Sequence, residues 1–190
     1  MATFTADVVY GTADEAVHET SAGAYDSTVD YLGAIGGTKY HPSYSWDNVT
    51  IPQGATIDSA ILEIYSTSPL GGAPTVDIYG DDEDDMAKWS TSDRPSGRAK
   101  TTATVNWSVS HSGAGNSPDL KTIVQEIVNR AGWASGNRLG IMFVVSTATD
   151  SLRDVQLTGG TDRTGTIIID YTASAGGGSP APVRRRFIRH

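Results

Sequence analysis

Short segments in which apolar and polar residues alternate recur along the 190-residue chain, and they constrain its fold more than any other feature. The clearest are residues 57–66, where one face is distinctly more apolar, and residues 75–79, which alternate strictly. Alternation with a period of two is typical of β-strands that bury one face. Turn signals rich in Pro and Gly follow or precede these segments, at 52–55 and 69–74. The chain is therefore expected to form antiparallel strands joined by loops.

Further segments of strand length complete this pattern. They lie at 3–10, 101–107, 139–145, 153–157 and 166–171. The segment 139–145 is a continuous apolar run, which predicts a central strand that is buried on both faces. Counted with weaker candidates, the chain is predicted to contain about eight to ten strands.

One segment, at about 118–130, has the pattern of an α-helix. Ser117 is placed to cap the free N–H groups at its start, and Pro118 suits the first helical position. Apolar residues follow at helical spacing from Leu120 onward, and Gly132 is expected to end the helix. The sequence thus predicts an all-β fold, a two-sheet antiparallel β-sandwich of jelly-roll type with one short α-helix.

Composition divides the chain into a domain and a tail. Residues 1–173 are expected to form the β-sandwich domain, 174–183 a linker rich in Gly, Ser and Pro, and 184–190 a basic arm. The arm has four arginines and no acidic residue, whereas the rest of the chain has 10 basic and 22 acidic side chains, a net charge of −12. A body this acidic disfavours contact with nucleic acid and with anionic membranes.

Several classes of protein are excluded by what the sequence lacks. The chain has no Cys, which rules out disulfide frameworks and thiolate zinc sites. It has no apolar run of about 18 residues that would span a membrane, and no segment near Met1 that has the pattern of a secretory signal. The GxSxG, HExxH and phosphate-loop motifs are missing as well, so a non-enzymatic protein without a cofactor is predicted.

Three segments resemble β-sandwich modules of large extracellular bacterial proteins. They are residues 49–60, with the sequence VTIPQGATIDSA, residues 98–107, which end in Thr-x-x-Val-x-Trp, and residues 117–137, the predicted helix and the following turn. The resemblance extends over roughly residues 40–145. It implies a sandwich like those that bind carbohydrate and a non-enzymatic role, because these modules carry no catalytic motif to transfer. With its basic arm and no partner module, the chain is also similar to decoration, fibre and tail modules of tailed bacteriophages.

These features predict a structural protein of a tailed-phage virion, either a capsid decoration or a tail-associated module. Its expected partners are other virion structural proteins, and a homo-oligomer within the assembly is expected. The arm is predicted to dock on a partner by pairing guanidinium groups with carboxylates and inserting its apolar pair into a pocket. The docking residues would be Arg184, Arg185, Arg186, Phe187, Ile188 and Arg189. The weaker alternatives for the arm are a solubilising tail and nucleic-acid binding.

Two other functions stay open, a secreted carbohydrate-binding or adhesion module and a subunit of an extracellular filament. For glycan binding, Trp89 is the candidate contact, because its polar neighbours favour an exposed indole. Trp46, Trp107 and Trp133 are instead expected to lie in the core or to anchor turns. The four His residues show no paired spacing and are expected at the surface.

Residues 81–85 are five consecutive acidic residues. A run of like charges is usually a solvated loop, and this is the interpretation that we favour. The alternative is a calcium site built from the carboxylates of Asp81, Asp82, Asp84 and Asp85. The run lacks the spacing of an EF-hand loop, and adjacent carboxylates on an extended chain cannot all face one ion.

Overall fold

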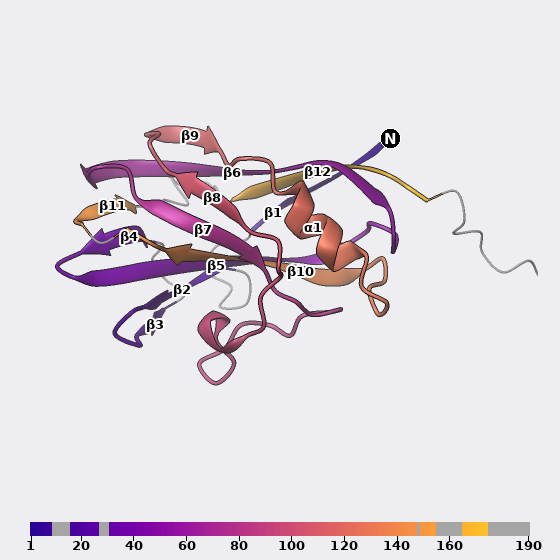
Figure 1. Cartoon of the computed structure of the whole chain (residues 1–190), viewed down its shortest axis with the longest axis horizontal. Coiled ribbons are helices and arrows are strands. Elements are labelled where there is room, and N and C mark those ends of the chain that lie inside the picture. The colour runs from indigo at the N-terminus through magenta and orange to yellow at the C-terminus, as the bar shows by residue number, and fades with distance from the viewer. Residues whose placement is uncertain (9–15, 27–30, 148, 155–164, 175–190) are drawn as a thin grey trace, which may run out of the picture.

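The computed structural model describes residues 1–8, 16–26, 31–147, 149–154 and 165–174 (Figure 1). These residues form twelve β-strands, one α-helix and one short 3₁₀ turn. The helix, α1, is Lys121–Val128, and the 3₁₀ turn is Pro95–Gly97. The strands are β1 (Ala2–Asp7), β2 (Ala16–Thr20), β3 (Tyr25–Asp26), β4 (Tyr31–Ile35), β5 (Thr38–Val49), β6 (Thr56–Gly71), β7 (Thr75–Gly80), β8 (Val105–Ser108), β9 (Gly113–Asn116), β10 (Asn137–Val145), β11 (Ser151–Asp154) and β12 (Thr166–Thr172).

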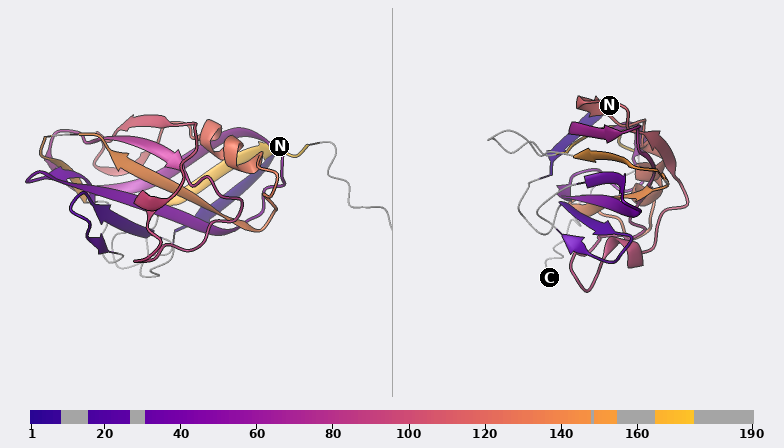
Figure 2. Two further views of the ribbon diagram at one scale, coloured as in Figure 1. Left: turned by 60° about the horizontal axis from the view of Figure 1, so that its bottom comes forward. Right: turned by 90° about the vertical axis from the view of Figure 1, so that its left-hand side faces the viewer.

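The described strands pair in antiparallel fashion and form two layers, whose strands face each other in the right-hand view of Figure 2. The first sheet has the order β9–β6–β12–β1. The second has the order β3–β2–β5–β10–β7–β8. Strands β4 and β11 connect β5 to the far end of β6, so β6 belongs to both sheets. The predicted all-β antiparallel sandwich with one helix is confirmed.

The main core lies between the two sheets and is built by the alternation that the sequence shows. Ala60, Leu62 and Ile64 of β6 are buried from one side, and Ile141 and Phe143 of β10 from the other. This cluster, which we call the inner core, also contains the three indoles that were expected there, Trp46, Trp107 and Trp133.

Helix α1 covers one end of the sandwich and packs on β6 and β7 (Figure 1). Its apolar face is buried, and Ile123 and Ile127 lie directly over Gly80, where a Cβ atom would come within 2.6 Å of the Ile127 side chain. The helix is shorter than the predicted span 118–130. Among the described residues there is no helix long and apolar enough to cross a membrane.

The start of α1 differs from the prediction because the residues before it bind a strand. Ser117 does not cap the helix; its hydroxyl accepts the Leu62 N–H at 3.0 Å. Asp119 accepts the Ala60 N–H at 2.9 Å and the Lys121 N–H at 3.0 Å. These side chains thus extend the edge of β6, and the helix begins only at Lys121.

Strand boundaries also move where side chains bind the backbone. β8 begins at Val105 and not at residue 101, because both carboxylate oxygens of Glu126 on α1 accept the N–H groups of Thr102 and Ala103 at 2.7 Å. The predicted strand 153–157 corresponds to β11, which begins at Ser151. The ends predicted for the strands 3–10 and 153–157 lie outside the described residues.

The connection between β7 and β8 folds back over the outer face of the second sheet. There it buries Met86 and Trp89 against Val17 of β2 and Met142 of β10, with Tyr25 packed at the side. We call these five residues and the connection above them the outer cluster. It explains why β10 is buried on both faces, as its apolar run predicted. Gly140 permits the close approach, because a Cβ atom there would lie 2.3 Å from the Met86 sulfur.

Candidate functional site

The predicted docking arm lies outside the described residues. This holds for the whole of 184–190 and for 175–183 of the predicted linker, so the docking roles of Arg184, Arg185, Arg186, Phe187, Ile188 and Arg189 stay predictions. The described chain ends just after β12, where the Ser174 hydroxyl donates a hydrogen bond to the Gly54 carbonyl oxygen.

Trp89 is not the exposed indole that its polar neighbours suggested. Only 2% of its surface is exposed, and the Arg98 guanidinium lies over its ring, 4.5 Å from the centroid. The indole is therefore enclosed between the second sheet and a cation. A glycan cannot stack on it in this arrangement, and the expectation of an exposed contact was wrong. Flanking residues did not reveal this, because the burial comes from a fold-back onto a distant strand.

The prediction of a solvated loop fails at the first residue of the acidic run, which is buried, whereas residues 82–85 are exposed or half-buried. Asp81 is 1% exposed and its carboxylate accepts a hydrogen bond from Arg98 at 2.7 Å. Arg98 also donates to both oxygens of Asp93, at 3.1 and 2.7 Å. Burial raises the pKa of the Asp81 carboxyl, and the hydrogen bond and charge of Arg98 oppose that shift. The Arg98 side chain thus ties the two ends of the outer-cluster connection together.

The other proposed calcium ligands bind partners within the chain. Asp82 and Asp84 both pair with Arg130, just beyond α1, and Asp85 accepts the backbone N–H of Arg138 at 2.8 Å. Asp85 therefore has a different partner from Asp82 and Asp84. Within the described ranges no group of three or more His, Asp or Glu side chains is placed to hold a metal ion.

The described histidines are more enclosed than expected. His18 is buried next to the rings of Tyr31 and Tyr40, and His111 stacks on Trp107 with ring centroids 5.6 Å apart. The expectation of a surface position was therefore wrong for His18. His190 lies outside the described residues.

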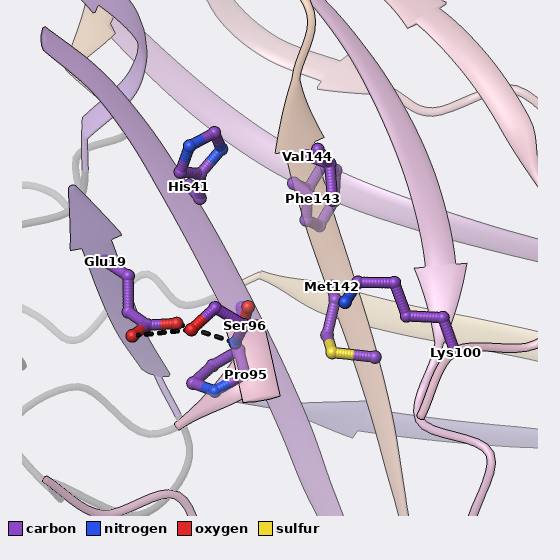
Figure 3. Close-up of a pocket in the computed structure, with 9 residues that line it drawn as sticks. Glu19, His41, Pro95, Ser96, Lys100, Met142, Phe143 and Val144 are labelled. Carbon is purple, nitrogen blue, oxygen red and sulfur yellow. Dashed lines mark hydrogen bonds between the residues drawn. The ribbon is translucent and has the colours of Figure 1, made fainter. Parts of the chain in front are cut away.

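A pocket of about 190 Å³ opens beside the outer cluster, and sequence reasoning missed it (Figure 3). Its floor is the outer face of the second sheet, where Met142 and Val144 of β10 lie. The segment 95–100 forms its wall. Glu19 on β2 and His41 on β5 are register partners on neighbouring strands and line one side.

Glu19 is a buried carboxylate that the wall of the pocket already binds. Its Oε2 accepts the Ser96 N–H at 2.7 Å, and its Oε1 accepts the Ser96 hydroxyl at 3.1 Å. The Arg94 guanidinium lies 3.8 Å from Oε1. Glu19 therefore fixes the 3₁₀ turn Pro95–Gly97 over the sheet, and its charge is partly compensated by these neighbours.

His41 presents a hydrogen-bond donor to the pocket. Its Nδ1 accepts the Val145 N–H at 2.9 Å, so the neutral ring carries its proton on Nε2. Burial lowers the pKa of the His41 imidazole, and the positive charges of Lys39 and Lys100 lower it further, against the opposing charge of Glu19. At neutral pH the ring is therefore uncharged and can donate from Nε2.

Lys100 is the second donor of the pocket. Its stem crosses the sheet face toward Met142, as Figure 3 shows. Within the described chain its ammonium has one hydrogen-bond acceptor, the Arg98 carbonyl oxygen at 3.5 Å, which is at the outer limit for such a bond. The described pocket thus combines donors, a carboxylate that is already bound and an apolar floor. The basic nitrogen of His41, Nδ1, is not available as a general base in this arrangement, because it accepts the Val145 N–H.

Comparison with known proteins does not assign the chain to a family. No protein-family model matches it, and no curated protein resembles it at a significant level. What the described fold and pocket define is an antiparallel β-sandwich module with a small site on the outside of one sheet.

Proposed function

We propose that the chain is a non-enzymatic structural protein of a tailed-bacteriophage virion, a capsid decoration or tail-associated module attached through residues 184–190. The observation that carries the proposal is the separation of charge, with four arginines in the arm and a net charge of −12 in the remainder. A cationic arm on an acidic body favours a protein partner with carboxylates over nucleic acid.

The arginines in the described part of the chain serve the fold, because their guanidinium groups bind oxygen atoms of the same chain. Arg98 and Arg130 bind the carboxylates described above, and Arg138 pairs with Asp47. Arg94 and Arg153 donate to the carbonyl oxygens of Gly23 and Gly72. These residues support the fold. The guanidinium groups of the arm are not needed for any of these contacts, which supports a role for the arm in binding a partner.

The position of β12 supports an arm that is separable from the domain. β12 is paired on both edges, with β1 and with β6. A chain that ends at Ala175 keeps every described strand and the whole inner core. Removal of the arm is therefore expected to leave the thermal stability of the domain unchanged while it prevents attachment.

The test is to produce particles with the full chain or with a chain that ends at Ala175, and to measure the copies of each per purified particle. We expect the full chain at high occupancy and the truncated chain to be absent. Phe187→Ala should weaken attachment at all salt concentrations by roughly 2 kcal/mol or more, because an apolar anchor is not screened. Arg185→Ala should weaken it mainly at low salt.

A matched control is a chain with the residues of the arm in scrambled order, which keeps the charge and separates Phe187 from Ile188. Full occupancy by the chain that ends at Ala175 would show that the sandwich itself attaches, and the docking role of the arm would be wrong. Absence of the full chain from purified particles would contradict the virion proposal as a whole.

The second candidate, a secreted carbohydrate-binding or adhesion module, is favoured by one observation, the pocket on the outer face of the second sheet. The burial of Trp89 counts against it, because the predicted stacking group is covered. Binding of the full chain to a glycan array, lost on His41→Ala, would support this candidate over the virion protein.

A further inference from the structure

The pocket beside the outer cluster is lined by two N–H donors, Lys100 and His41, and by the apolar surface of its floor. We propose that it binds a small monocarboxylate with a short apolar body, whose carboxylate contacts Lys100 and His41. This proposal concerns a site built from described residues outside the arm, so it goes beyond the proposed attachment and is tested independently of it.

The ammonium of Lys100 provides the charge that such a ligand would need. It has three N–H donors, and its one described acceptor is a neutral carbonyl oxygen at 3.5 Å. At least two donors are therefore left for a ligand. Lys39, whose charge also acts on His41, donates to the Ser146 carbonyl oxygen at 3.4 Å. Lys100 is the one cationic side chain among the described residues that line the pocket.

His41 adds a neutral donor at a fixed position. The bond from the Val145 N–H to Nδ1 holds the ring orientation and leaves Nε2–H as the donor. A carboxylate oxygen accepts hydrogen bonds and donates none, which matches a site whose ligand-facing groups are N–H donors. An ammonium and an imidazole N–H on one carboxylate form charge-assisted hydrogen bonds, which are stronger than neutral ones.

Glu19 lines the same pocket but does not compete with an anion as a free carboxylate would. Both of its oxygens accept hydrogen bonds from Ser96, and Arg94 lies 3.8 Å away. Each Glu19 oxygen thus accepts one hydrogen bond from the wall of the pocket.

The rest of the lining sets the size and polarity of the ligand. Met142, Val144 and Pro95 line the pocket with apolar surface, and its volume is about 190 Å³. That space admits an acyl chain or small ring of a few carbon atoms next to the carboxylate, but not an oligosaccharide. Butyrate and benzoate represent the two shapes.

The experiment titrates the full chain with sodium butyrate, followed by calorimetry and by the amide resonances of β5 and β10. We expect millimolar binding, with shifts at residues that line the pocket. Butanamide has the same shape without the charge, and its affinity should be at least about tenfold weaker. Lys100→Met keeps the apolar stem and should reduce butyrate affinity by a similar factor.

Two controls show whether a loss of butyrate affinity comes from the pocket itself. One tests whether removal of any lysine has the same effect, and the other tests whether the variant is folded. Lys121→Met removes an exposed lysine on α1 and should bind butyrate as the wild type does. Thermal unfolding of every variant shows whether it is folded, and the butanamide comparison uses the unaltered chain, so a variant that fails to fold leaves the proposal testable.

Affinity for butyrate should change little between about pH 7.5 and about 5.5, because Nδ1 of His41 accepts the Val145 N–H and burial lowers the pKa of the imidazole, so the ring stays neutral. The charged groups that act on His41 are Lys39, Lys100 and Glu19. The proposal would be overturned by no binding of butyrate, by equal binding of butyrate and butanamide, or by equal losses in Lys100→Met and Lys121→Met. Binding of glucose in the absence of butyrate binding would also overturn it, in favour of the carbohydrate-binding candidate.

Discussion

The inner core and the outer cluster cover opposite faces of the second sheet, and they are built in different ways. The inner core joins two regular layers of strands, and its residues alternate along the strands with residues that face the other side of the sheet. The outer cluster lies under an irregular connection that is fixed by Arg98, Asp81 and Asp93. One region depends on alternation along strands, the other on charge pairs that hold a connection in place over the sheet. The pocket lies beside the second kind of region.

Neighbouring residues of β10 allow the two regions to be compared directly, because Phe143 belongs to the inner core and Met142 to the outer cluster. Phe143→Ala is expected to lower the free energy of unfolding by about 3–5 kcal/mol, since it opens a cavity between two rigid layers. Met142→Ala should cost less, about 2 kcal/mol, because the covering loop can settle into the space. Urea unfolding of both variants measures the difference. A larger loss for Met142→Ala would reverse the assignment of the main core.

Arg98→Met tests whether charge pairing holds the outer cluster in place. The change leaves Asp81 buried without its cation, and we expect a loss of about 3 kcal/mol at pH 7, together with faster proteolysis between residues 81 and 100. Arg130→Met, which removes a partly exposed ion pair, is the control and should cost about 1 kcal/mol or less. Equal effects of the two variants would show that burial of Asp81 has little energetic consequence.

The loss in Arg98→Met should depend on pH in a defined direction. Burial already raises the pKa of Asp81, and removal of Arg98 raises it further, because the interactions that opposed burial are gone. A carboxyl with a raised pKa in the folded state stabilises the fold at low pH, and this stability is lost as pH rises through that pKa. The deficit relative to the wild type should therefore be largest near neutral pH and shrink toward about pH 4. Adding Asp81→Asn should remove this dependence.

The smallest expected effect concerns calcium. Asp82 and Asp84 pair with Arg130, and the run as a whole points toward several partners, so addition of calcium or of a chelator should leave the melting temperature unchanged. Differential scanning calorimetry of the full chain measures this. An increase of several degrees with calcium, abolished in the double variant Asp82→Asn with Asp84→Asn, would establish the metal site that the acidic run suggested.

The parts of the fold that could be predicted are those that local pattern determines. The apolar run of β10 and the helical spacing of Ile123 and Ile127 follow from burial along one element. The start of α1 was mispredicted because Ser117 binds the backbone of β6 instead of the helix, which only the tertiary fold decides.

The site was harder to predict because none of its contacts is local. Glu19 and His41 meet across two strands, and Lys100 arrives from the connection that precedes β8. Trp89 has polar neighbours in sequence, yet Arg98 and the second sheet enclose it. One sequence signal could have indicated this burial. Met86 and Trp89 are large apolar residues in a connection that is otherwise rich in charged residues and has no strand or helix pattern. Apolar residues in such a setting indicate a loop that packs on a distant surface.

The position of β12 between β1 and β6 has a mechanical consequence. The hydrogen bonds that join antiparallel strands are perpendicular to the strands. If the rest of the domain is held and Ser174 is pulled along β12, the force therefore acts in shear on all the hydrogen bonds from β12 to β1 and to β6 at once. A pull that separates Ala2 from its register partner Tyr171 instead opens one ladder bond by bond, like a zipper. A domain tethered through its C-terminal end would therefore resist tension along its strongest direction, whereas traction between its two ends would peel β1 away at low force.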